Sequence, residues 1–151
     1  MNVQVTIRIQ EDDFDLNREA DALAGDGQAG AVVSFVGRVR KEGDLSILRL
    51  EHYPKMTEAE IGRMVEEAGD RWSLLGVTVI HRVGALAPGA RIVLAMVASS
   101  HRHAAFEACQ FLMDYLKTKA PFWKEEMRGT ARHWVEQRAS DDQAATRWRK
   151  N

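Results

Sequence analysis

The chain has 151 residues, of which 45% are hydrophobic and 28% are charged, and its formal net charge is −1. This composition is typical of a globular protein, and the charge gives no overall attraction to nucleic acid or anionic membranes. The single cysteine, Cys109, has no internal disulfide partner, and no apolar segment approaches the roughly 20 residues of a membrane span. We therefore expect a cytoplasmic protein that folds as one domain over residues 1–151.

The first third of the chain is expected to be mostly strand. Alternating apolar residues near the N-terminus predict a half-buried strand: Val3, Val5, Ile7 and Ile9. Asp15 is expected to cap a short helix over about 16–23. The apolar run over 30–37 is typical of a central strand, and the alternating segment 45–53 predicts another.

The middle of the chain predicts a helix followed by two strands. Thr57 precedes Glu60 by three residues, which is the pattern of a capping box at the start of a helix. This helix has an apolar stripe of Ile61, Met64, Val65, Ala68 and Trp72. Strands are predicted over 77–83 and 91–98, joined by a turn-rich segment at 84–89.

A long amphipathic helix is predicted from His101 to about Lys119, capped by Ser99 or Ser100. Its core-facing stripe is Ala105, Ala108, Cys109, Leu112 and Leu116. A strand over 122–127 and a short helix over 141–148 complete the chain. Hairpins and helices therefore alternate, which predicts an α+β fold with a split βαβ, ferredoxin-like portion.

The segment from Lys117 to Lys124 is the most informative part of the sequence. Pro121 ends the long helix, and Phe122 and Trp123 lead directly to the second lysine. This pattern predicts two cations at the edge of an apolar pocket. A partly desolvated lysine beside a second cation can act as a nucleophile or proton carrier, or the pair can stabilise an oxyanion or a phosphate. Two solvated lysines are the alternative, and the residues alone leave the choice open.

A second basic group, His101 and Arg102, stands at the start of the same helix, where backbone N–H groups favour an anion. Arg102 and Lys117 are separated by about 22 Å at the helical rise. A small ligand cannot touch both within one chain, so a shared site requires two subunits. The alternative is that these residues only complement the helix dipole.

Other candidates carry weaker signals. Arg38 and Arg40 follow a buried strand. Arginines at such a position bind phosphate through two hydrogen bonds, or they are plain surface charges. His101 and His103 lack a third ligand at recognisable spacing, so no metal site is expected, and Cys109 lies on the core stripe and is not expected to be a nucleophile.

Two further histidines have open roles. His81 falls in phase with the apolar residues of its strand, so we expect a hydrogen-bonded core residue. His52 is either structural or lines a site.

Taken together, the chain resembles the catalytic (large) subunit of molybdopterin synthase. The resemblance covers almost everything from about residue 28, and the segment ending in the two lysines is its most specific part. The matching stretches are residues 30–40, 50–54, 56–57, 80–84, 100–124, 134–136, 138 and 142–145.

The resemblance implies an α/β hammerhead fold with an added β-rich portion. It implies a central homodimer with a small ubiquitin-like sulfur carrier bound at each end, forming a heterotetramer. The carrier's C-terminal Gly-Gly thiocarboxylate would enter a pocket of the large subunit. Two sulfurs would then pass to cyclic pyranopterin monophosphate and form the dithiolene of molybdopterin, with no cofactor or metal needed for the transfer.

The resemblance also implies roles for individual residues. Lys117 and Lys124 match the family's essential lysines, which would position the thiocarboxylate, assist proton transfer and stabilise charge. The positions that match substrate-binding residues are Arg40, His101, Arg102 and Arg138, of which the last three would come from the neighbouring subunit. The positions that match pocket-lining residues are Phe35, Met113 and Glu126. Arg38 stands where either basic residue fits, and His103 and Cys109 receive no role.

Two other classes of function remain possible from the residues alone. An acylphosphatase-like hydrolase also combines a split βαβ fold with an arginine after a strand, and it would release phosphate without a protein partner. A non-enzymatic dimer that binds a nucleotide or RNA is disfavoured, because a broad basic stripe with exposed aromatic residues is absent.

Overall fold

The computed structural model describes residues 3–135 and 139–149. Within these residues the elements follow in the order β1 (Gln4–Gln10), α1 (Leu16–Ala24), β2 (Ala31–Arg38), β3 (Leu45–His52), α2 (Met56–Arg71), β4 (Gly76–Arg82), β5 (Gly84–Leu86), β6 (Arg91–Ser99), α3 (Arg102–Thr118), β7 (Phe122–Arg128), β8 (Ala131–Val135) and α4 (Ala139–Thr146). The expected α+β class is confirmed.

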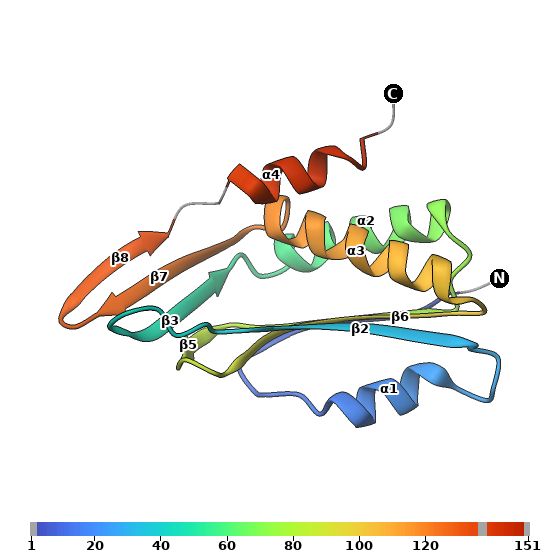
Figure 1. Ribbon diagram of the computed structural model, residues 1–151, viewed down its shortest axis with the longest axis horizontal. Coiled ribbons are helices and arrows are strands. Elements are labelled where there is room, and N and C mark those ends of the chain that lie inside the picture. The colour runs from blue at the N-terminus through green and yellow to red at the C-terminus, as the bar shows by residue number, and fades with distance from the viewer. Residues whose placement is uncertain (1–2, 136–138, 150–151) are drawn as a thin grey trace.

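The strands form two sheets. The first sheet has the order β1-β4-β6-β2, with β1 parallel to β4 and the other pairs antiparallel. The second sheet has the order β5-β3-β7-β8 and is antiparallel throughout. Helix α1 covers one face of the first sheet, and α2 and α3 cover the other (Figure 1). The segment expected as a turn at 84–89 contains the short strand β5, and β8 was not expected.

The main core lies between the first sheet and the helices α2 and α3. The predicted stripe of α3 is confirmed, since every member is buried: Ala105, Ala108, Cys109, Leu112 and Leu116. Strands β4 and β6 supply buried residues to both faces, so a smaller cluster with Phe14 and Leu23 forms under α1. None of the helices in the described ranges combines the length and apolarity that a membrane span requires.

The residues after α4 are held against α2 and α3 by Trp148. Its indole N–H donates to the buried Asp114 carboxylate over 2.6 Å, and its ring lies edge-on to Phe111 and Trp72. The Trp148 carbonyl accepts a hydrogen bond from Arg71. Because buried polar groups are costly without partners, the pairing with Asp114 fixes this segment in one place.

Both helix caps predicted for α2 and α3 are wrong. Helix α2 begins one residue before Thr57, and it is the Lys55 N–H that is bonded by a side chain, the Glu58 carboxylate, at 2.7 Å. The Thr57 hydroxyl is instead buried and donates to the Pro121 carbonyl over 3.2 Å. Ser99 ends β6, and its hydroxyl donates to the Ser73 carbonyl, so α3 is preceded by His101 without a side-chain cap. The cap predicted at Asp15 is confirmed.

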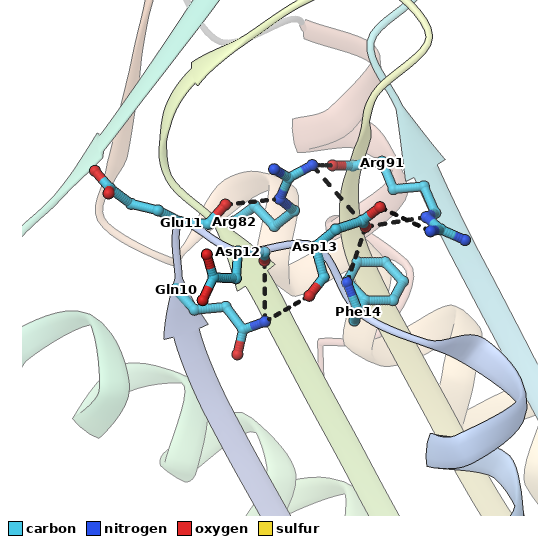
Figure 2. A network of polar contacts seen from close by, with 7 residues as sticks. All are labelled: Gln10, Glu11, Asp12, Asp13, Phe14, Arg82 and Arg91. Carbon is cyan, nitrogen blue, oxygen red and sulfur yellow. Dashed lines mark hydrogen bonds and ion pairs between the residues drawn. The ribbon is translucent and has the colours of Figure 1, made fainter.

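A polar network ties the segment after β1 to the ends of β4 and β6 (Figure 2). Arg91 binds both carboxylate oxygens of Asp13, at 3.0 and 2.7 Å. Arg82 donates to the carbonyls of Glu11 and Arg91, each over 3.0 Å. The end of β4 is therefore bonded both to the segment after β1 and to the start of β6.

Lys55 has φ 71° and ψ −47°, a strained conformation for a residue with a side chain. Lys55→Gly is expected to raise the free energy of unfolding by about 1 kcal/mol, because glycine reaches positive φ without a Cβ clash. Urea denaturation measures the change. Lys55→Ala is the control, since it keeps the Cβ and the strain; equal stability of the two variants would contradict the explanation.

The hydrogen bonds from Arg91 lower the pKa of Asp13 below its ordinary value of 3.8. Asp13 therefore contributes stability above that value, and this contribution is lost as the pH falls through the lower, folded-state pKa. We expect Asp13→Asn to be less stable than the wild type at pH 7, with the difference shrinking as the pH falls below 3.8. Thermal unfolding across this range tests it. Asp12→Asn is the control, because Asp12 enters the network only through its backbone carbonyl; a constant difference for Asp13→Asn would refute the linkage.

Candidate active site

The two lysines predicted to act together lie on neighbouring elements. Lys117 is exposed in the last turn of α3, and Lys124 is partly buried on β7. On β7, Phe122, Lys124 and Glu126 share one face. Lys124 pairs with Leu50 of β3, which is completely buried, so this face is directed toward the core. Lys124 therefore stands at the border of the apolar interior.

His81 lies at the end of β4, next to the strand face of β7 that carries Phe122 and Lys124. Its ring stacks on Phe122 with centroids 3.8 Å apart and planes inclined by 18°. Its Nδ1 lies 2.8 Å from the Arg82 carbonyl oxygen. Burial lowers the pKa of His81 to about 3, and the charges of Lys117 and Lys124 act in the same direction, against the hydrogen bond to Arg82. The expected hydrogen-bonded histidine is confirmed, and it also adjoins the predicted site.

The turn between α3 and β7 is braced by β3 and α2. His52 pairs with Phe122 across the strands, and its Nε2 lies 3.6 Å from a Glu58 carboxylate oxygen. Tyr53 packs on Trp123 with ring centroids 4.6 Å apart. Together with the hydrogen bond from Thr57 to the Pro121 carbonyl, these contacts fix the position from which Lys124 emerges.

Met113 and Phe35 lie on the α3 side of this region. Met113 is buried on α3, one helical turn before Lys117, and therefore on the same face of the helix. Phe35 is 42% exposed on β2, which packs against α3. These positions are compatible with the pocket lining expected of both residues.

Arg40 and Glu126 are linked through a residue that sequence reasoning missed, Arg128. Arg40 is exposed and donates to Glu42 over 2.8 Å. Arg128 donates to the Glu42 carbonyl over 2.7 Å and to the Glu126 carboxylate over 2.9 Å. The bond to Glu126 is the main reason that the pKa of Arg128 is raised. The alternation of Glu126 and Arg128 on one strand face was a signal for their pairing, but the contact with Glu42 is not readable locally.

A pocket of about 570 Å³ opens at the start of α3. Its lining residues are Gly30, Ser100, His101, Arg102, His103, Phe106 and Glu107. His101 and Arg102 thus meet in one pocket, and neither lysine lines it. A Cβ on Gly30 would lie 2.1 Å from the Ser100 carbonyl oxygen, so β2 and the start of α3 touch through bare backbone.

Arg138 lies outside the described residues. Burial raises the pKa of the Cys109 thiol to about 11, and its sulfur lies 3.5 Å from the Ala95 carbonyl. Within residues 3–135 and 139–149, no three His, Cys, Asp or Glu side chains group closely enough to hold a metal ion.

Several known proteins are similar to this chain in sequence and fold. The family model described as MoaE protein matches residues 9–119. The molybdopterin synthase catalytic subunit of Mesorhizobium japonicum is 58% identical, over 95% of this chain and 93% of that protein, and the one of Escherichia coli is 54% identical, over 89% and 92%. Among solved structures, the molybdopterin biosynthesis MoaE protein of Burkholderia ambifaria has a TM-score of 0.85 at 48% identity, covering 96% of this chain and 98% of that one. Molybdopterin synthase of Staphylococcus aureus has a TM-score of 0.77 at 25% identity, covering 89% and 96%. The chain therefore belongs to the MoaE protein family.

Proposed function

We propose that this chain is the catalytic subunit of a molybdopterin synthase. In this role it transfers sulfur from the C-terminal thiocarboxylate of a small ubiquitin-like carrier to cyclic pyranopterin monophosphate. The observation that carries the proposal is the placement of Lys124 on the inward face of β7 together with Phe122, on which His81 stacks, while Lys117 lies in the last turn of the preceding helix. Relatives that are more than half identical over nearly the whole chain bear the name of this subunit.

The lysine site suits an anionic tail better than a free metabolite. Lys124 borders the interior while Lys117 faces solvent, so an extended chain end can lie along the apolar wall and place its charge between two ammonium groups. Such cations stabilise the negative charge that shifts as the thiocarboxylate sulfur attacks carbon. Met113 and Phe35 provide the apolar flank of this path.

The phosphate of the substrate requires a second basic site, and we assign it to His101 and Arg102. These residues line the pocket at the far end of α3, about 22 Å from Lys117 along the helix. A substrate that meets both sites must lie between two subunits, so the proposal includes a homodimer. Arg40 and Arg138 belong to the same substrate set by resemblance.

Lys117→Ala is expected to abolish dithiolene formation when the chain is mixed with a thiocarboxylated carrier and cyclic pyranopterin monophosphate. The reason is that the variant loses one of two charges that face the transferred sulfur. The dimer should persist, since Lys117 is exposed. Lys119→Ala, at the exposed end of the same helix, is the control and should keep its activity. Full activity of Lys117→Ala would refute the role.

Glu42→Gln is expected to lower the KM for the cyclic pyranopterin by about two- to five-fold, with kcat unchanged. In the free protein the Glu42 carboxylate is paired with the Arg40 guanidinium, so an anionic substrate that binds Arg40 must displace this carboxylate. An exposed ion pair of this kind is worth about 1 kcal/mol or less, which sets the size of the effect. Steady-state kinetics measure it. Glu60→Gln, which breaks the separate pair with Arg63 on α2, is the control; an unchanged KM in Glu42→Gln would show that Arg40 does not bind substrate.

A further inference from the structure

The tautomer of His81 follows from its contact with the backbone. Its Nδ1 lies 2.8 Å from the Arg82 carbonyl oxygen, which can only accept a hydrogen bond. Nδ1 must therefore carry the proton. In a neutral imidazole the other nitrogen, Nε2, then has a free lone pair.

The surroundings of His81 keep the ring neutral. Burial is the main reason that the pKa of His81 falls to about 3. Positive charge faces the ring from Lys117 of α3 and Lys124 of β7, and His52 of β3 acts in the same direction. His52 itself lies 3.6 Å from Glu58. At neutral pH the His81 ring is therefore an uncharged hydrogen-bond acceptor.

The orientation of the ring is fixed from two directions. The stacked Phe122 holds the ring plane, and the Arg82 carbonyl holds one edge. The Arg82 backbone is held in the sheet, since Arg82 pairs with Gln10 of β1, and its guanidinium is bonded to the carbonyls of Glu11 and Arg91 (Figure 2). Phe122 and Lys124 share one face of β7, so the ring lies on the side of the strand from which the Lys124 ammonium extends.

We propose that His81 is a positioning residue for the lysine pair, whose Nε2 accepts a hydrogen bond from one of the two ammonium groups. An ammonium group has three N–H donors, so fixing one of them aims the remaining two. His81 does not touch the sulfur or the pterin in this proposal, which rests on the proposed function of Lys117 and Lys124. The acceptor limits the rotation of a long, flexible side chain at the point where charge develops.

Three substitutions separate this role from simple packing. His81→Phe keeps the stacked ring and removes both nitrogens, and His81→Asn keeps an amide donor for the Arg82 carbonyl but has no group at the place of Nε2. His81→Gln reaches that place with an amide oxygen. We expect kcat to fall about ten-fold in the Phe and Asn variants and to recover in part in the Gln variant, with KM for the pterin nearly unchanged.

The matched control is His133→Asn on β8, which should keep full activity. Equal losses in all three His81 variants, in proportion to their stability, would overturn the proposal. Unchanged kcat in His81→Phe would overturn it as well. If the wild type itself forms no dithiolene, the proposed function fails rather than the inference about His81.

A second measurement does not depend on turnover. Nitrogen NMR of the His81 ring should show the neutral tautomer with the proton on Nδ1 throughout pH 6 to 8, a window around the ordinary histidine value of 6.5. Lys117→Met and Lys124→Met remove one ammonium group each, and the Nε2 resonance should move in the variant that lacks the donor. A ring that titrates in this window, or an Nε2 resonance that moves in neither variant, would refute the hydrogen bond.

Discussion

The burial of one face of α3, from Ala105 to Leu116, is the constraint on which the rest of the structure depends. Its apolar stripe packs on β6 and β2, so the helix cannot bend or shift without exposing the core. A helix of fixed rise separates the groups at its ends by a fixed distance. The pocket with His101 and Arg102 and the lysine site are therefore held apart by the same interaction that stabilises the fold.

The second sheet brings charge to the border of this core. Its inward row contains Leu48, Leu50 and His52 on β3, and the paired row on β7 contains Phe122, Lys124 and Glu126. Placing a lysine in such a row is costly unless its charge has a purpose or a partner. The braced turn before β7 and the stacked His81 hold the backbone and the neighbours of Lys124 in place.

The sequence predicted the elements whose apolar residues recur at regular spacing. It also singled out the lysines that have aromatic residues as their neighbours in the chain. Helix α3, its buried stripe and the strand that begins at Phe122 were all found, because apolar spacing and Pro121 are local signals. The caps predicted for α2 and α3 were wrong, since the hydroxyls of Thr57 and Ser99 bond to carbonyls far away in the chain, whereas the cap at Asp15 was found. The contact between Arg128 and Glu42 and the stacking of His81 on Phe122 were missed for the same reason: each joins residues that are far apart in the chain.

The contact between Gly30 and Ser100 limits how this protein can diversify. No side chain fits at position 30 unless the backbone of Ser100 moves, and that backbone leads directly into His101. Substitution is thus excluded on one wall of the pocket. The other wall is formed by His103, Phe106 and Glu107, and these helical positions accept any of the common helix-forming residues. Changes in the ligand preference of this pocket, whether by evolution or by design, are therefore expected to accumulate on α3 and to leave the start of β2 untouched.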